Sequence, residues 1–362
     1  MKVRLKELGE IITGNTPSKK IKEFWNSEDI YFIKPDIIED SGVNEISETN
    51  EYISEEARKK ARIVTKKSIF VTCIGSIGKI GIASAGEYAF NQQINAIVPN
   101  EKVQSKYLAY NLLYNKPRLV AMANAPVVPI INKRQFGEFI VNIETDIGRQ
   151  VKIVNVLDRL THIIRLSKQE LEKLDELIKA RFVEMFGDPI INSKHLETKE
   201  LKDILILKAG DFTAASDIAD EPSEFNPYPC YGGNGIRGYV VEYNQEGEYS
   251  LVGRQGALSG NVQFASGKFK NTEHALLVTP IVEMNCIWLN QLLVNLDLKR
   301  YQTGAAQPGL SVKNLQEIKI LCVSIDEQKA FADFVRQVDK SKLMFQKLHQ
   351  KLNILRQKAG NI

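Results

Sequence analysis

The chain has 362 residues, of which 43% are hydrophobic and 25% charged, and its formal net charge is +4. This composition is ordinary for globular protein, and no stretch approaches the ~18 apolar residues that a transmembrane helix needs. The N-terminal residues alternate charged and apolar side chains, so we expect no signal peptide. A chain of this length is expected to form two or three domains, and its mild positive charge permits local basic patches without indicating a partner.

The cysteines do not predict a metal site. Cys73, Cys230, Cys286 and Cys322 are scattered without a CxxC pair, and none of the four histidines lies near one of them. The simplest interpretation is four reduced thiols in a cytoplasmic protein.

Residues 1–145 are predicted to form a first globular domain that mixes short strands with helices. Apolar and β-branched runs bounded by glycine predict strands at 69–75 and 81–85. The apolar spacing over 103–115 predicts a short helix.

Residues 146–187 are predicted to form a long central helix. The stretch 147–186 has no proline and no glycine after Gly148, and Gly187-Asp188-Pro189 ends it. Its apolar residues recur at steps of three and four, close to the heptad pattern of coiled coils. At 1.5 Å per residue the helix is about 60 Å long, which is too long to be buried in a small domain.

Residues 188–325 are predicted to form a second mixed domain, and 326–362 are predicted to form a second long helix. Strands are expected at 249–253, 261–265 and 275–280. A short helix is expected over 285–298 because its apolar residues have helical spacing.

The two halves of the chain repeat one another. Three segments recur in the same order, namely 5–18 as 201–216, 75–99 as 256–280 without a gap, and 131–141 as 310–320. Each copy is followed by a long helix. We therefore predict an α+β fold in which one unit, a globular domain and a long helix, occurs twice.

Apolar residues at heptad-like positions of the two long helices predict a pairing seam. The seam is interrupted at Ser167 on the first helix and at Ser341 on the second. Its predicted members are Leu157, Leu160, Ile164, Leu171, Leu174 and Ile178 on the first helix, and Phe334, Val338, Phe345, Leu348 and Leu352 on the second.

No catalytic motif can be assembled. Gly233-x-Gly235-x-x-Gly238 matches a dinucleotide fingerprint, but a predicted strand follows it, and Asn234-Gly235 is typical of a hairpin turn. Gly75 to Lys79 has two residues between its glycines where a phosphate-binding loop has four. Asn226-Pro227-Tyr228 lies in a polar stretch, 211–229, that predicts a surface loop, and no glycine-rich methyltransferase motif accompanies it. A nuclease or methyltransferase with an unrecognised site stays the alternative.

Glycine-rich loops with polar and basic neighbours are better suited to binding DNA. Arginine matches guanine and asparagine or glutamine matches adenine, while lysine mainly contacts phosphate. The candidate DNA-binding residues are Thr16, Ser18, Lys19, Lys20, Lys34, Ser76, Lys79, Asn91, Gln92 and Gln93 in the first copy, and Tyr231, Asn234, Arg237, Arg254, Gln255, Lys268, Lys270 and Asn271 in the second. The simpler alternative is that many of them are ordinary polar loop residues.

A set of motifs occurs in a fixed order in both halves. The first half has Trp25, GNTPS at 14–18, DIYFIKPDII at 29–38, GSIG at 75–78 and NQQINAIVP at 91–99. The second half has YPCYGGNGIRGY at 228–239, LVGRQGALSGNV at 251–262 and GAAQPGLSVKNLQEIKI at 304–320. Gln150 and Gln328 stand at the starts of the long helices. With these motifs the chain resembles the specificity subunits of type I restriction–modification systems over nearly its whole length.

The resemblance implies two target-recognition domains that each read half of a bipartite site on double-stranded DNA. It also implies that the long helices pack antiparallel and that their length fixes the gap between the half-sites. In this family two methylation subunits bind S-adenosylmethionine and methylate the DNA, and motor-nuclease restriction subunits join through that methylation complex. The specificity subunit itself is expected to be non-catalytic, cytoplasmic, free of metal and cofactor, and not bound to a membrane.

Apolar residues off the seam predict a docking surface for the methylation subunits, because exposed apolar surface usually marks a protein interface. They are Val154, Val156, Ile163, Leu166, Leu177 and Phe182 on the first long helix, and Val335, Leu343, Met344 and Ile354 on the second. The alternative is that the recognition domains fold back and cover them.

Overall fold

The computed structural model describes residues 1–123, 128–256, 258–304 and 309–360, the side chains of 357–360 excepted. Part of the predicted GAAQPGLS motif, 305–308, lies outside the described residues. The chain divides into two compact units. Unit 1 comprises residues 1–168 and the end of the chain from residue 347, and unit 2 comprises residues 169–346. No helix in the described residues is long and apolar enough to cross a membrane.

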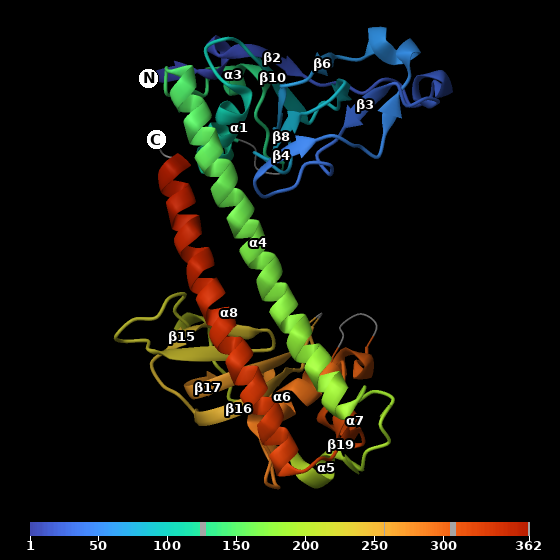
Figure 1. Ribbon diagram of the computed structural model, residues 1–362, viewed down its shortest axis with the longest axis vertical. Helices are drawn as coiled ribbons and strands as arrows, with labels where there is room; N and C mark the ends of the chain where they lie inside the picture. Colours follow the sequence, from blue (N-terminus) through green and yellow to red (C-terminus); the bar gives the residue numbers. More distant parts are fainter. Residues whose placement is uncertain (124–127, 257, 305–308, 361–362) are drawn as a thin grey trace. The chain divides into compact units, whose positions relative to one another are not determined.

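Unit 1 is built on two sheets, of order β2-β10-β7-β8-β4 and β5-β3-β9-β6, and on the separate pair β1-β11 (Figure 1). The strands are β1 (Lys2–Arg4), β2 (Gly9–Thr13), β3 (Ile30–Ile33), β4 (Val43–Ile46), β5 (Tyr52–Ile53), β6 (Ile63–Thr65), β7 (Ile69–Thr72), β8 (Ile80–Ala83), β9 (Glu87–Phe90), β10 (Ile94–Pro99) and β11 (Ile140–Asn142). The helices are α1 (Ser105–Tyr114), α2 (Lys116–Met122) and α3 (Lys133–Glu138).

The core of unit 1 follows from the alternation of side chains along β7. Ile69 and Val71 pack into the core that contains α1, whereas Phe70 packs into a second core with Tyr88 and Phe90. A strand that is buried on both faces reads as a continuous apolar run, which is why 69–75 could be predicted as a strand.

Unit 2 has one six-stranded sheet, of order β13-β18-β16-β17-β14-β15, and the separate pair β12-β19. The strands are β12 (Thr198–Glu200), β13 (Leu205–Ala209), β14 (Tyr228–Gly232), β15 (Gly235–Val240), β16 (Gln245–Gly253), β17 (Val262–Asn271), β18 (Ala275–Pro280) and β19 (Lys319–Leu321). The helices are α5 (Leu201–Ile204), α6 (Cys286–Asn295) and α7 (Val312–Gln316). The hairpin at Asn234-Gly235 is confirmed, because β14 and β15 pair up to Gly232 and Gly235 across that turn.

The two globular domains repeat the same strand pairing in the same register. Gly9 lies opposite Pro99 in the β2-β10 pair, and Leu205 lies opposite Pro280 in the β13-β18 pair. These residues are equivalent in the sequence repeat. The pairs β1-β11 and β12-β19 correspond in the same way. The predicted repeat is therefore confirmed, down to individual residue pairs.

A buried glutamine attaches each long helix to its own globular domain. Gln150 accepts a hydrogen bond from the backbone N–H of Gln104 at 2.7 Å and donates to the carbonyl of Glu144 at 2.7 Å. Gln328 accepts from the backbone N–H of Asn285 at 2.9 Å and donates to the carbonyl of Val323 at 3.0 Å. Gln104 and Asn285 are the N-caps of α1 and α6. Both glutamines thus satisfy backbone groups at a helix start that would otherwise be buried without partners.

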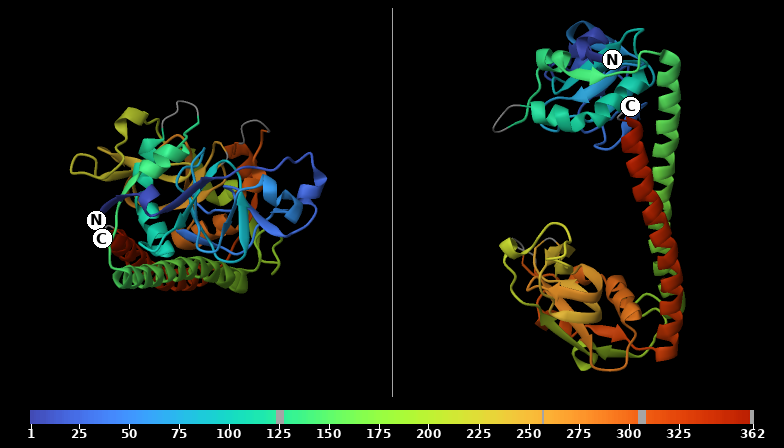
Figure 2. Two further views of the ribbon diagram at one scale, coloured as in Figure 1. Left: turned by 90° about the horizontal axis from the view of Figure 1, so that it is seen from above. Right: turned by 90° about the vertical axis from the view of Figure 1, so that its left-hand side faces the viewer.

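The long helices are α4 (Ile147–Phe186) and α8 (Ile325–Gly360), and they are antiparallel in unit 2, where both views show them side by side (Figures 1 and 2). The Phe182 and Phe331 ring centroids are 5.4 Å apart. Lys342 Nζ lies 2.6 Å from Asp175 Oδ1. Along the pair, a lower residue number on α4 lies opposite a higher residue number on α8. The predicted antiparallel pairing is therefore confirmed.

The seam prediction needs two corrections. Leu157 packs into the core of the first domain, and Leu348 is 41% exposed. By contrast, Ile164 and Leu352 are buried on their helices, and Val338 is buried in unit 2. The first turns of α4 face a domain instead of a helix, which a heptad count cannot reveal. The other predicted seam residues are half-buried or buried, namely Leu160, Leu171, Leu174, Ile178, Phe334 and Phe345.

The predicted docking surface also loses three residues. Val154 belongs to the core of the first domain, and Phe182 and Val335 belong to the core of the second. They cannot be exposed to a partner, because the start of α4 packs on the first domain, and the end of α4 and the start of α8 pack on the second. The remaining residues of the prediction are exposed, namely Val156, Ile163, Leu166, Leu177, Leu343, Met344 and Ile354.

Candidate nucleic-acid interface

A glycine at the same place in each domain fixes the segment that carries the first polar residues. A Cβ on Gly14 would lie 2.1 Å from the carbonyl oxygen of Asn91, and a Cβ on Gly210 would lie 2.1 Å from that of Asn271. No other residue fits such a contact. The chain after β2 is thereby held against the turn before β10, and the chain after β13 is held near the end of β17.

The glycine loops are anchored in the same way in both domains. Ile131 N–H donates to the backbone carbonyl of Cys73 at 2.8 Å, and Leu310 N–H donates to that of Arg254 at 2.8 Å. Beyond these anchors, Gly75 and Gly256 have φ values of +76° and +75°, and a Cβ on either would meet no described atom within 4 Å. Glycine is required here for its left-handed conformation, and the space beside it is open to a ligand.

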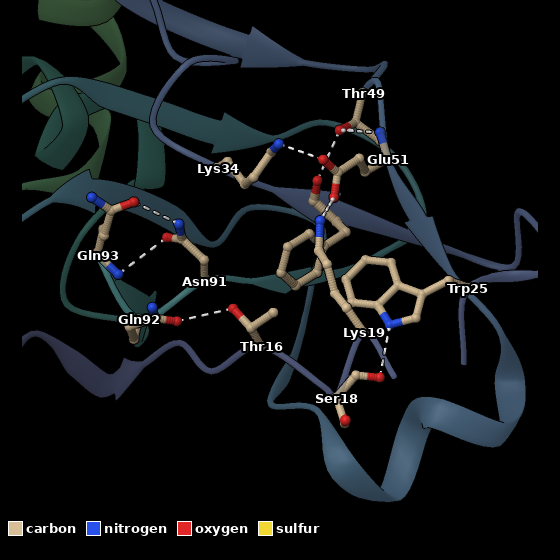
Figure 3. A network of polar contacts seen from close by, with 11 residues as sticks. Thr16, Ser18, Lys19, Trp25, Lys34, Thr49, Glu51, Asn91, Gln92 and Gln93 are labelled. Carbon is tan, nitrogen blue, oxygen red and sulfur yellow. Dashed lines mark hydrogen bonds and ion pairs between the residues drawn. The ribbon is translucent and has the colours of Figure 1, made fainter. Parts of the chain in front are cut away.

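Two lysines of the first domain share one carboxylate (Figure 3). Lys19 Nζ lies 3.1 Å from Glu51 Oε2, and Lys34 donates to Glu51 Oε1. The hydrogen bond from Lys34 holds the pKa of Glu51 below its usual range, although burial opposes this effect. The same bond raises the pKa of Lys34. Glu51 and Lys34 are therefore charged at neutral pH, and Glu51 competes with DNA phosphate for both lysines.

The turn before β10 carries three predicted residues and contacts a fourth, Thr16 (Figure 3). Thr16 Oγ1 donates to Gln92 Oε1 at 2.9 Å, and Asn91 Nδ2 donates to Gln93 Oε1 at 2.8 Å. Gln92 is exposed, but Asn91 is 6% exposed. The prediction that Asn91 contacts DNA is wrong, because its side chain closes the turn from inside.

Other predicted residues of the first domain lie on its surface without converging. Ser18, Lys20 and Ser76 are exposed. Lys79 is half-buried and donates to the carbonyl of Pro35 at 3.3 Å. These side chains remain available to phosphate.

The second domain also pairs its lysines internally. Lys270 Nζ lies 3.5 Å from Asp211 Oδ2, and Lys268 Nζ lies 4.8 Å from the ring centroid of Tyr243. Asn271 is buried, with its amide 3.4 Å from the carbonyl of Ala275, so it cannot contact DNA as predicted.

Tyr231 is half-buried, and its ring centroid lies 5.4 Å from that of Phe269, so one face of the ring is fixed by the domain core while its contact with DNA stays a prediction. The remaining predicted residues of the second domain reach the surface. Asn234 accepts from Asn261 at 2.7 Å, and Arg237 is exposed. Arg254 is half-buried, and Gln255 is exposed beside it.

Three further residues belong to these surfaces and were not predicted. Glu51 joins Lys19 and Lys34, and Glu273 and His274 lie beside Gln255. His274 and Glu273 have a signal in the sequence, because the gapless repeat aligns them with Gln93 and Gln92. Glu51 has no such signal in the sequence, because it comes near the lysines only when β3 and β5 pair.

The described residues contain no group of three or more His, Cys, Asp or Glu side chains that could hold a metal ion. The cysteines are free thiols, and burial raises the pKa of Cys73 to about 12. The candidate interface therefore consists of glycine-rich loops that carry basic and amide side chains.

Comparison with known proteins places these loops in a family. A family model described as type I restriction modification DNA specificity domain matches residues 1–176 and again 193–355. The EcoprrI specificity subunit of a type I restriction enzyme from Escherichia coli is 30% identical over 349 residues, which is 92% of this chain and 86% of that protein. The MjaIX specificity subunit from Methanocaldococcus jannaschii is 29% identical over 235 residues, 59% of this chain and 54% of that protein.

Solved structures show the same fold. The type I restriction–modification S subunit from M. genitalium has a TM-score of 0.61 at 17% identity, covering 100% of this chain and 95% of that one. A chain from a structure on assembly and conformational transition of the type I system also has a TM-score of 0.61, at 14% identity, covering 100% and 96%. Because the family model matches both halves and the E. coli relative aligns over nearly the whole length, the chain belongs to the type I restriction–modification DNA specificity family.

Proposed function

We propose that this chain is the sequence-specific DNA-recognition subunit of a type I restriction–modification complex. The observation that carries the proposal is the repeat of one loop frame in both domains, with different side chains on each copy. Ile74 and Gln255 form bridges at equivalent places, and Gly75 and Gly256 have the same left-handed conformation. An unchanged frame with changed polar groups is suited to reading two different half-sites on double-stranded DNA.

The chain itself is expected to bind DNA without catalysing a reaction. Methylation is assigned to two partner methylation subunits that hold S-adenosylmethionine, and cleavage is assigned to motor-nuclease subunits that join through them. We place this assembly in the cytoplasm.

The test uses the purified full-length chain with duplex DNA, magnesium and S-adenosylmethionine. Binding without cleavage or methyl transfer is the expected result. A rate of cleavage or methyl transfer that rises with the concentration of the isolated chain, and that a heat-denatured sample lacks, would instead favour a nuclease or methyltransferase.

The exposed apolar residues of the long helices are proposed as the docking surface for the methylation subunits. In unit 2, Leu177 is 47% exposed on α4 and Met344 is 66% exposed on α8. Apolar side chains exposed on two neighbouring helices are typical of protein interfaces. Leu177→Asp with Met344→Asp should abolish co-purification of the methylation subunits. The charge change alone is controlled by Lys179→Gln with Lys340→Gln, which lowers the net charge by the same amount at exposed positions of the same helices. Full assembly of the apolar variant would exclude this surface.

A further inference from the structure

The turn before β10 and the turn before β18 are the same structure in the two domains. Ile94 N–H donates to Asn91 at 3.2 Å, and Ala275 N–H donates to Thr272 at 3.1 Å. Both turns are attached to the neighbouring glycine loop by backbone hydrogen bonds. Cys73 N–H donates to the carbonyl of Gln93 at 2.7 Å, and Arg254 N–H donates to the carbonyl of His274 at 3.1 Å. Residues 93 and 274 therefore occupy one position on one backbone frame.

The side chains at this position differ chemically. Gln93 carries an amide, which offers a donor and an acceptor together and matches the N6 and N7 edge of adenine. His274 carries an imidazole, which can present one ring N–H as a donor to the N7 or O6 acceptor of guanine. The difference is thus of the kind that changes a base preference.

His274 is held in place by its neighbours. Its Nε2 lies 3.1 Å from Glu273 Oε1, and its Nδ1 lies 3.1 Å from Gln255 Oε1. Glu273 is mostly buried, and its Oε2 has no hydrogen-bond partner among the described residues. The imidazole ring is 40% exposed. Glu273 therefore orients the ring from within the domain, and a base edge would take the place of Gln255 Oε1 at Nδ1, on the accessible side of the ring.

The space in front of the ring is suited to a base edge. Gln255 precedes Gly256, where an added Cβ would meet no described atom within 4 Å. Gln255 is exposed, and its Oε1 lies 3.1 Å from His274 Nδ1, so a base edge that contacts the Gln255 amide also comes near the His274 ring. In the first domain the corresponding space beside Gly75 lies next to Gln93 in the same way.

We propose that residue 274 in the second domain and residue 93 in the first are equivalent base-reading positions. In the second domain His274 reads a guanine, with Glu273 as its positioning residue. In the first domain Gln93 reads an adenine. The proposal rests on the proposed function, and it adds which side chain of each domain distinguishes the two half-sites.

The test exchanges the two side chains in the full-length chain. The parent, His274→Gln and Gln93→His are each co-expressed with the methylation subunits, and methylated sites are mapped by single-molecule sequencing. His274→Gln should change the preference at one base pair of one half-site by about tenfold, from guanine towards adenine. Gln93→His should make the reverse change in the other half-site. Glu273→Gln should weaken the guanine preference without moving it to another position.

Gln316→His is the matched control, because Gln316 is exposed in the second domain at the end of α7. It should leave the site unchanged. Unchanged half-sites in both exchange variants, with a bipartite site for the parent, would overturn this inference and leave the proposed function intact. A parent without any bipartite site would contradict the proposed function itself. If one variant does not fold, as judged by circular dichroism, the other decides the question in its own half-site.

Discussion

Glu51 shows how a single residue can regulate the charge that the first domain offers to DNA. Lys19 and Lys34 could be predicted from the sequence because basic residues beside a polar motif favour phosphate contacts. Their pairing with Glu51 could not, because Glu51 reaches them across the fold. The predicted sites at Asn91 and Asn271 were wrong for a similar reason, since residue type does not reveal which amide points inward.

Replacing Glu51 should therefore strengthen DNA binding that is independent of sequence. Glu51→Gln releases Lys19 and Lys34 to phosphate, so the dependence of log K on log salt should steepen by about one unit for each additional phosphate that a lysine neutralises. The measurement is a titration of non-specific duplex DNA at several salt concentrations. Glu48→Gln, at a nearby exposed glutamate, is the control. Equal slopes for both variants would show that Glu51 does not withhold these lysines.

The effect has a defined pH dependence. The pKa of Glu51 is lowered, mainly by Lys34, so its ion pairs stabilise the fold above the ordinary glutamate pKa of about 4.3. That stabilisation is lost as the pH falls through the lowered value. Between pH 6 and 8 the difference between the parent and Glu51→Gln should accordingly stay constant.

At the scale of elements, the boundaries of α4 could be predicted because the stretch lacks helix breakers until Gly187. The role of its first turn could not. Gln150 bonds to Lys102 and Gln104, far earlier in the chain, and Val154 and Leu157 follow it into the domain core. A local pattern shows that a helix forms but not which part of it is attached to a domain.

The glutamine attachment predicts a local loss of stability. Gln150→Leu removes the partners of three backbone groups and should destabilise unit 1 by about 2 kcal/mol. Amide hydrogen exchange should accelerate at the starts of α1 and α4, while unit 2 is unaffected. Gln169→Leu, at an exposed position of the same helix, should change stability by less than about 0.5 kcal/mol. If the two variants behave alike, the buried amide does not attach the helix.

At the scale of the whole molecule, the repeat was the most predictable feature because three segments recur in order. The repeat predicted the fold, but it did not predict the DNA sequence that either domain recognises. On the proposed function, the long helices also set the gap between the half-sites. Their length then becomes a property of the recognised DNA.

Lengthening both helices tests that role. Four residues inserted near Ser167 and four near Ser341 add slightly more than one helical turn, roughly 6 Å, to each helix. The methylated site should gain one or two base pairs between its halves, with both half-sites unchanged. A gap of the original length would mean that the spacing is determined elsewhere.

Domain exchange tests the central claim that each globular domain reads its own half of the site. Residues 1–145 are replaced by the corresponding domain of another family member, and the chimaera is expressed with the methylation subunits. Single-molecule sequencing of the methylated DNA should show that one half-site changes to that of the donor protein while the other half-site stays the same. An unchanged site, or simultaneous change of both halves, would contradict the account.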